Sequence, residues 1–432
     1  MRQMTRRQTL KAAAVAAPTL GLWACGNDDS TGGDGGPVEL RYAFWGGDSR
    51  AQMTQEMIDE FEAENADIDV RPDYSDFGAY WDKLATSVAS GDAPDIITMG
   101  GAYPSEYAGR GSLLDLGQVS DIIDTDRIDA AVLDNGMIDG SLYALPTGVN
   151  TYAVVANRAL FDEAGVDFPD DRTWTWDDFL QICVALSESL GDDRFGTQDA
   201  TNHNTLMLWA RQRGESLYTA DGGLGISAES VAEWWELALQ LRDRGGAPSA
   251  TLTAELESQN APEQTLIGTN SAGLSLIWSN VLDVLRQASG EELVLLKPPG
   301  ESEGQPGTWL GPSMFYTISA DSDHPEEAAE LVDFMLNDPD AAEAFLTDRG
   351  LPVNPEVREE ILDELTPGQR VEAEFLTRME SEVGEAPPPP PVGSSETALI
   401  VSRLNSEVLF DRLTPQEAAE QFVAETEAAL GV

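Results

Sequence analysis

Tryptophan side chains that adjoin small polar residues are the groups in this sequence best suited to recognising a ligand. The chain contains ten tryptophans, and Trp45, Trp278 and Trp309 each lie where an apolar segment gives way to Gly, Ser or Asn. A flat aromatic face stacks on the C–H face of a sugar ring, while Asp, Asn and Arg bind the hydroxyls. We expect Trp234 and Trp235, inside an amphipathic helical pattern, to be core residues. The other three positions are candidates for sugar binding.

Motifs for catalysis and for metal binding are scarce. The two histidines, His203 and His324, are too few and too far apart in the sequence for a metal cluster or an HExxH helix. There is no GxSxG elbow, P-loop or complete GxGxxG motif. Because the chain has 77 acidic residues, nearly any window offers a carboxylate pair, so such pairs carry no weight as a glycosidase signal. We therefore predict a protein that is not an enzyme and uses no cofactor or metal. A secreted glycoside-active enzyme is the alternative.

The charge balance excludes one class of partner. The 432 residues include 25 Lys and Arg against 77 Asp and Glu, a formal net charge of -52. Nucleic-acid binders neutralise phosphates with a basic face, so we expect no nucleic-acid partner and no binding to an anionic membrane surface. Such a surplus of carboxylates repels itself unless salt screens it. We hypothesise a halophilic, high-salt habitat.

The amino terminus has the features of an export signal. Residues 1–24 contain an apolar run directly preceded by a basic segment with Arg6 and Arg7, which is similar to the twin-arginine motif. The run ends in a sequence that resembles a lipobox, in which Cys25 would be lipidated. Residues 25–37 have the composition of a flexible tether. We expect twin-arginine export and a lipid anchor on the outer face of the cytoplasmic membrane, with no other membrane contact.

Strand and helix patterns alternate from the end of this tether onward. Residues 38–44 and 68–74 are predicted strands, and 95–99 is typical of a buried parallel strand. Helical spacing of apolar residues separates them, and strand-helix-strand alternation indicates an α/β domain. The recurrence of the pattern further along the chain favours two lobes.

Helix start signals are clear in the later part of the chain. Capping boxes at Thr175 and Thr414 predict helices, and Asp338-Pro339 predicts another that ends at Gly350. Cys183 lies in the helical pattern after Thr175, and with no partner cysteine in the mature chain it is expected to be a buried apolar residue rather than a nucleophile.

Several segments, taken together in their order, match one family. The body of the chain resembles the extracellular solute-binding proteins of family 1, the maltose-binding-protein-like receptors of carbohydrate ABC importers. The segments that carry the resemblance are 44–48, 80–84, 90–96, 106–108, 111–116, 145–151, Asn157, 175–179, 277–280, 324–329 and 349–354.

The resemblance implies a two-lobed α/β fold, the type II periplasmic-binding-protein fold, with a hinge of crossover strands. The implied first lobe comprises 38–149 and about 313–354, and the second about 150–312 and 355–432. Closure of the lobes around a sugar would be the mechanism, and ABC permease subunits would be the partners of the closed form. A monomer best suits such a shuttle.

The resemblance also implies a set of cleft residues by matching position. These are Trp45, Asp48, Asp76, Tyr80, Tyr103, Asn150, Trp209, Trp278, Asn280, Trp309 and Ser313.

Two departures from the family pattern concern the shape of the cleft. The loop 387–395 has no aromatic residue where some relatives place one over the sugar, and 99–102 is small where relatives carry bulkier polar residues. Both predict a roomier cleft or a different sugar. A binder of other solutes, such as peptides, polyamines or polyols, stays open as a further alternative, and it would require the tryptophans to be core residues.

Overall fold

The computed structural model describes residues 36–432 except 102, 129, 192, 220, 258–261, 303, 388 and 389. Residues Pro37–Val432 form one compact unit. The expected leader at 1–24, the lipidated Cys25 and all but the end of the expected tether lie outside the described residues.

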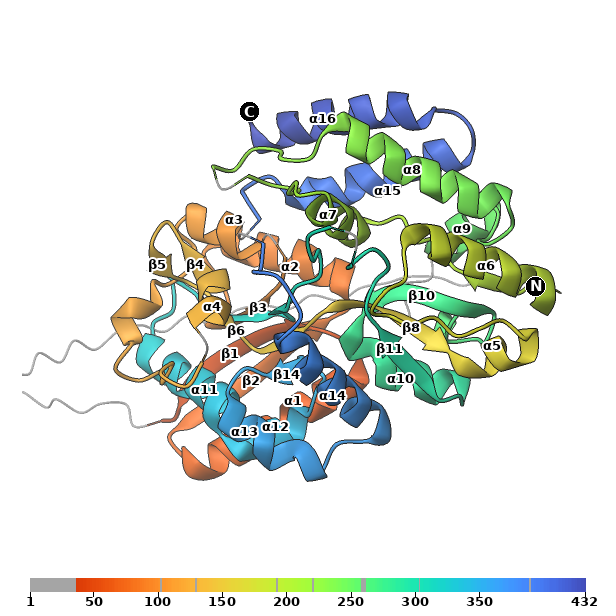
Figure 1. Ribbon diagram of the computed structural model, residues 1–432. Coiled ribbons are helices and arrows are strands. Elements are labelled where there is room, and N and C mark those ends of the chain that lie inside the picture. The colour runs from red at the N-terminus through yellow and green to blue at the C-terminus, as the bar shows by residue number, and fades with distance from the viewer. Residues whose placement is uncertain are drawn as a thin grey trace, which may run out of the picture. The chain divides into compact units, whose positions relative to one another are not determined.

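A five-stranded sheet forms the core of the first lobe, in the strand order β2-β1-β3-β13-β6 (Figure 1). Its strands are β1 (Val38–Trp45), β2 (Ile68–Ser75), β3 (Ile96–Met99), β6 (Leu145–Pro146) and β13 (Phe315–Ile318). β1 pairs in parallel with β2 and β3, which confirms the three strands predicted there. β13 pairs antiparallel with β3 and β6, so a segment from late in the chain completes this sheet.

Helices cover this sheet because their apolar residues recur at helical spacing. In α1, Met57, Ile58 and Phe61 are buried in the first-lobe core, and Phe61 packs against Phe334 of α11 with ring centroids 5.4 Å apart. The elements of this lobe outside the sheet are α1 (Asp48–Glu64), α2 (Phe77–Ser90), α3 (Tyr103–Gly109), α4 (Ala130–Leu133), the hairpin β4 (Met137–Ile138) and β5 (Ser141–Leu142), α11 (Pro325–Asn337), α12 (Pro339–Phe345) and α13 (Pro355–Glu360).

A four-stranded sheet forms the core of the second lobe, in the order β11-β8-β10-β9. Its strands are β8 (Tyr152–Asn157), β9 (Phe195–Thr197), β10 (Ala272–Trp278) and β11 (Leu293–Leu296). Every residue of β8 is buried, because β10 and β11 pair with its two edges and helices cover its faces. This arrangement accounts for the uninterrupted apolar run in β8.

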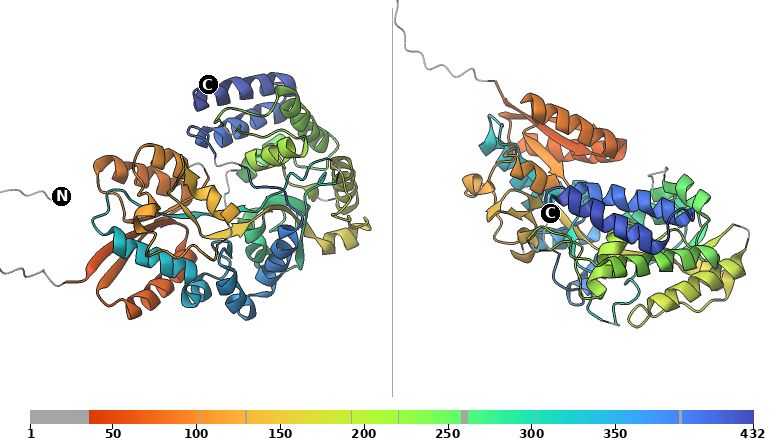
Figure 2. Two further views of the ribbon diagram at one scale, coloured as in Figure 1. Left: turned by 60° about the vertical axis from the view of Figure 1, so that its left-hand side comes forward. Right: turned by 90° about the horizontal axis from the view of Figure 1, so that it is seen from above.

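The helices of the second lobe come from both the middle and the end of the chain. They are α5 (Arg158–Ala164), α6 (Trp176–Leu190), α7 (His203–Gln212), α8 (Ala228–Asp243), α9 (Ala250–Glu257), α10 (Leu282–Ser289), α14 (Pro367–Glu380), α15 (Ser395–Leu409) and α16 (Pro415–Leu430). Helices α8, α15 and α16 lie side by side (Figure 2), and Trp235 of α8 packs edge-on against Phe422 of α16. Trp234 and Trp235 are core residues, as predicted.

Local start signals in the sequence are largely confirmed. The capping boxes at Thr175 and Thr414 are both formed, and Cys183 is a free, fully buried cysteine whose thiol pKa is raised by burial. The prediction that the helix from Pro339 extends to Gly350 is wrong. It ends at Phe345, because Leu346 takes a φ of +48° that a helix cannot continue.

A small three-stranded sheet joins the two lobes, in the order β12-β7-β14. Its strands are β7 (Gly148–Asn150), β12 (Gly311–Pro312) and β14 (Leu351–Pro352). β7 ends at Asn150 and β12 begins at Gly311. The strands approach closely at Gly148, where a Cβ atom would lie only 2.6 Å from the Gly350 carbonyl carbon. Glycine is therefore required there for tight packing of the hinge.

The end of the hinge region contacts both cores. Val357, Ile361 and Leu365 are buried with the first-lobe core, although they follow the expected return to the second lobe at 355. Helix α14 contributes Leu376 to that core and Phe375 to a core cluster with β8 and β11. The packing therefore favours a boundary within α14.

Candidate functional site

An aromatic cluster forms around Trp45 at the end of β1. The Trp45 ring packs against Phe77, Tyr80 and Trp81 of α2 with centroid distances of 5.5 to 5.7 Å. Trp45 is partly exposed. Its ring also covers Gly100, where a Cβ atom would lie 3.2 Å from the tip of the indole. The small residue at 100 is therefore explained by contact with Trp45, and not only by a roomier cleft.

Two predicted carboxylates flank this aromatic cluster at helix N-termini. Asp48 is the first residue of α1, is exposed, and accepts a 3.4 Å hydrogen bond from the Tyr74 hydroxyl. Asp76 precedes α2, is exposed, and makes no capping hydrogen bond with its side chain. Both carboxylates are placed where they could accept hydrogen bonds from the hydroxyl groups of a ligand.

Tyr80 and Tyr103, also predicted to bind ligand, pack inward. Tyr80 is only 3% exposed, and its hydroxyl donates to the Thr98 carbonyl at 2.7 Å, so it belongs to the core of the first lobe. Burial is the main cause of its raised pKa. Tyr103, half-buried, stacks on Trp81 with ring centroids 3.4 Å apart. Neither residue stands out from the surface as Trp45 does, and Tyr80 lies in the core of the first lobe.

The most exposed aromatic residue among the described residues of the first lobe is Phe77, which is not among the predicted ligand residues. Phe77 is 57% exposed and packs edge-on against Trp45 and Trp81. Phe77 and Trp81 are four residues apart and so lie on the same side of α2, whereas Tyr80 faces the sheet. Helical spacing alone does not separate Phe77 from Tyr80, because residues three apart also share one side of a helix.

A second group of predicted residues meets at the hinge. The side-chain amide of Asn150, a residue that is 5% exposed, donates to the side-chain Oδ1 of Asn280 at 3.4 Å, and Asn150 pairs with Gly311 across the hinge sheet. The Asn150 side-chain oxygen is buried and accepts no hydrogen bond from any described residue. Buried polar atoms are nearly always satisfied, so this oxygen is a vacant acceptor at the junction of the lobes.

Trp278 lies at the end of β10, two residues before Asn280. It is partly exposed, and its ring packs edge-on against Tyr152 at 5.4 Å and Trp309 at 6.2 Å. Trp309 itself is buried beneath it, with its carbonyl accepting from the Thr151 hydroxyl at 2.7 Å. Trp309 therefore supports the ring of Trp278 from the buried side.

Of the remaining predicted residues, one lies beside the hinge and the other lies in the core of the second lobe. Ser313 is partly exposed and its backbone N–H donates to the Gly148 carbonyl at 2.8 Å, which places it beside the hinge. Trp209 is buried in the second-lobe core, with its indole N–H donating to the Ser230 carbonyl at 2.9 Å. It lines a separate pocket of about 470 Å³ bounded by α6, α7 and α8, so it does not join the Trp278 group.

Val392, which belongs to the segment without an aromatic residue, lies beside α3 of the first lobe. Val392 is 57% exposed, and a side chain added at Gly109 in α3 would lie 3.8 Å from it. Burial is the main cause of the raised pKa of Tyr103. Side chains of α3 raise it further, and so does the Glu396 carboxylate at the start of α15. Both Val392 and Glu396 are therefore close to the first lobe at α3.

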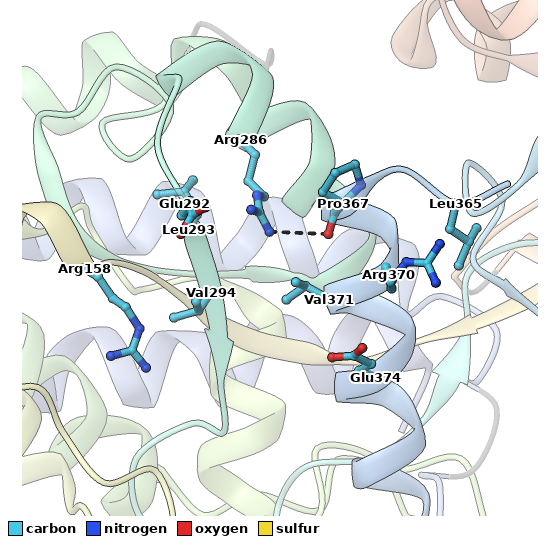
Figure 3. Close-up of a pocket in the computed structure, with 10 residues that line it drawn as sticks. All are labelled: Arg158, Arg286, Glu292, Leu293, Val294, Leu365, Pro367, Arg370, Val371 and Glu374. Atoms are coloured by element: carbon cyan, nitrogen blue, oxygen red, sulfur yellow. Dashed lines mark hydrogen bonds between the residues drawn. The ribbon is translucent and has the colours of Figure 1, made fainter. Parts of the chain in front are cut away.

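A pocket of about 510 Å³ lies between α10, β11 and α14 (Figure 3). Arg158, Arg286 and Arg370 line it together with two glutamates, and Arg286 donates to the Pro367 carbonyl at 3.5 Å. None of the predicted ligand residues lines this pocket. It is the solvent-facing side of α14, opposite the buried face of that helix.

Neither a metal-binding cluster nor a membrane-spanning helix occurs among the residues that the structure describes. Within the described ranges, no group of three or more His, Cys, Asp or Glu side chains is arranged to hold a metal ion. Of the helices that the structure describes, none has the length and apolar character needed to cross a membrane.

Comparison with a solved protein identifies the fold. An extracellular solute-binding protein of family 1 from Alicyclobacillus acidocaldarius is 29% identical and superposes with a TM-score of 0.70 over 92% of this chain and 99% of its own. The two sheets, the covering helices and the hinge sheet described above are those of a two-lobed periplasmic solute-binding protein.

Sequence relatives and a family model agree with this fold. A lactose-binding protein of Rhizobium radiobacter is 23% identical over 62% of this chain and 63% of its own, and an erythritol/L-threitol-binding protein of Mycolicibacterium smegmatis is 26% identical over 58% and 60%. The model for bacterial extracellular solute-binding proteins matches residues 56–367. The chain therefore belongs to the bacterial extracellular solute-binding proteins.

Proposed function

We propose that this protein captures a mono- or oligosaccharide between its two lobes and delivers it to the permease subunits of an ABC importer, without catalysing a reaction. Delivery to such an importer is the standard role of the family. A sugar-binding relative, the lactose-binding protein, supports a carbohydrate as the ligand. The proposed site comprises Trp45, Asp48, Asp76, Phe77, Asn150, Trp278, Asn280 and Ser313.

The vacant acceptor on Asn150 is the observation that carries this proposal. It lies at the hinge, is hydrogen-bonded through its amide to Asn280, and has the partly exposed Trp278 two residues away from that partner. A sugar offers hydroxyl donors around its edge and apolar C–H groups on its face, so one ligand could satisfy Asn150 and stack on Trp278.

Lobe closure follows from the hinge. Three short strands connect two lobes that have separate cores, and the first-lobe aromatic cluster belongs to one core while Trp278 belongs to the other. A ligand that contacts both stabilises the closed form over the open form by the difference in its affinity for them. The boundary between the lobes is proposed to lie within α14.

A polyol is the second candidate ligand, because one relative is an erythritol/L-threitol-binding protein. A linear polyol offers hydroxyls but no ring face, so it would depend on Asn150 and the carboxylates more than on Trp278. Peptides, polyamines and a glycoside-active enzyme have no comparable support among the described residues. The proposal also includes twin-arginine export, a lipid anchor at Cys25, a monomeric state and a high-salt habitat.

The deciding experiment is a titration of intrinsic tryptophan fluorescence in molar salt with mono- and oligosaccharides and C4 polyols, with the solution assayed for cleaved product. Saturable change without product supports the receptor and identifies its ligand class. Product formation would overturn the non-enzymatic role, and no response to any saccharide or polyol would overturn the carbohydrate assignment.

A further inference from the structure

Arg50 in α1 bridges two parts of the first lobe that are far apart in the sequence. Its Nε donates to Asp348 Oδ2 at 2.7 Å and its Nη2 donates to Asp348 Oδ1 at 3.2 Å, which makes a two-point ion pair. Its Nη1 donates to the backbone carbonyl of Trp45 at 3.1 Å. One guanidinium group therefore ties the backbone of a proposed ligand residue to Asp348.

The Trp45 carbonyl lies at the end of β1, on the edge where strand pairing has already stopped. The pairing of β1 with β3 ends at Ala43. The Gly46 N–H donates to the Ser75 carbonyl of β2 at 3.0 Å, and in a planar trans peptide the Trp45 carbonyl points the opposite way. Arg50 therefore supplies a donor to this carbonyl on the edge that β3 leaves open.

The stem of the Arg50 side chain lies closely against the backbone at Gly46. Gly46 has a φ of +151°, and a Cβ atom there would lie 2.7 Å from Arg50 Cδ and 2.9 Å from Arg50 Cβ. The side chains of Arg50 and Asp348 are 18% and 23% exposed. Salt screens such a partly buried pair less than a surface pair, so we expect the bridge to persist in molar salt.

Asp348 belongs to a segment that is fixed against the hinge sheet. The carbonyl of the next residue, Arg349, accepts from the Thr147 hydroxyl at 2.9 Å, and Thr147 directly precedes β7. The same segment continues into β14, which pairs with β7. The bridge through Arg50 thus gives the backbone of Trp45 a fixed position relative to the strands that connect the lobes.

We propose that Arg50 is a positioning residue for ligand binding: it anchors the backbone of Trp45 to Asp348 and so holds the Trp45 ring in place for stacking on a sugar. The aromatic cluster restricts the ring, and Arg50 restricts the backbone from which the ring projects. The role of Trp45 as a ligand contact rests on the proposed function. The position of its ring in the protein without ligand does not, so the two can be tested separately.

The first test measures acrylamide quenching of Trp45 in molar salt without ligand, as the difference between each protein and its Trp45→Phe counterpart. Arg50→Met keeps an unbranched side chain but removes its donors, and it should raise the accessibility of Trp45 to acrylamide. Asp348→Ala removes the anchor and leaves Arg50 in place, and it should raise the accessibility as well. An unchanged value in either variant would overturn the proposal.

Arg194→Met is the matched control for this measurement. Arg194 forms the same kind of bridge in the second lobe, with hydrogen bonds to the two Glu163 carboxylate oxygens at 2.9 and 2.7 Å and to the Leu190 carbonyl at 2.9 Å. Its loss should leave the quenching of Trp45 at the parent value. An equal rise in this control would show a general loosening of the protein and would count against a specific role for Arg50.

A double-mutant cycle for lactose binding, measured by isothermal titration calorimetry, tests whether Arg50 acts through Trp45. Arg50→Met alone should weaken binding about tenfold, whereas the same change in the Trp45→Ala background should have little further effect. Unchanged binding in Arg50→Met, or losses that add in the double variant, would contradict the proposal. If lactose binds to none of the proteins, the proposed ligand fails and the quenching values alone decide the role of Arg50.

Discussion

The aromatic cluster of the first lobe and the hinge group of the second lobe use different chemistry. Around Trp45, rings pack on rings, and the carboxylates of Asp48 and Asp76 stand at the edge of that surface. Around Trp278, polar side chains form a connected set that reaches the hinge strands and the buried Glu372. The first region offers a rigid apolar wall, whereas the second couples ligand contact to the element that moves.

The pH dependence of stability is the largest expected difference between the regions. Because the pKa of Glu372 is raised from 4.5 to about 8 in the folded protein, its contribution to stability is present in full below pH 4.5 and is lost as the pH rises to about 8. The loss amounts to roughly 5 kcal/mol. Glu372→Gln should remove this slope in denaturant unfolding measured across pH 4.5 to 9. An unchanged slope would show that the carboxyl does not titrate in the hinge.

Removal of the buried guanidinium of the first lobe is expected to have the next largest effect. Arg349 is 3% exposed, donates to the hydroxyls of Tyr316 at 3.1 Å and Thr54 at 2.8 Å, and contacts the Tyr42 hydroxyl. Arg349→Met should lower the free energy of unfolding by about 3 kcal/mol, because three hydroxyls lose a charged donor. Arg403→Met, which removes only an exposed ion pair with Glu425, should change it by less than about 1 kcal/mol. Equal losses would contradict a special role for Arg349.

Trp278→Ala tests the hinge group as a stacking site. The variant should bind a ring sugar more weakly by about 1 to 3 kcal/mol, by isothermal titration calorimetry, since the residue lies partly exposed at a buried acceptor. Phe410→Ala, a change at an aromatic residue 37% exposed after α15, is the matched control and should leave the affinity unchanged. If the ligand is a polyol, Trp278→Ala and the control should differ little.

Phe77→Ala tests the rigid wall of the first lobe and has the smallest expected effect. Phe77 is already largely exposed, so its removal should cost less than about 1 kcal/mol of stability. The affinity for a long oligosaccharide should fall more than the affinity for a monosaccharide if Phe77 contacts an outer ring. An equal fall for both would place Phe77 at the central ring.

The fold could be predicted further than the site, for reasons visible in single residues. Strands 38–44, 68–74 and 95–99 and the two capping boxes depend on local periodicity, and the structure forms them. The sequence predicts a helix from Pro339 to Gly350, which is longer than the helix in the structure. The end of that helix is set by Leu346 and by the packing of the next residues into the hinge.

Burial of individual aromatic residues could not be predicted in the same way. Tyr80 and Phe77 lie three residues apart on one helix, and only the sheet beneath them decides which one is covered. Trp309 and Trp278 each precede small polar residues, and tertiary contact places one beneath the other. Glu372 is one of 77 acidic residues, and nothing in its local sequence distinguishes it from the exposed Glu374.

The position of β13 between β3 and β6 has a consequence for how the chain folds during synthesis. Residues 315–318 complete a sheet whose first strand begins at residue 38. Until they leave the ribosome, β3 and β6 present unpaired edges, and the first lobe has a high contact order that slows its folding. The two lobes therefore mature together late in translation, and neither can be expressed as a simple N-terminal or C-terminal half.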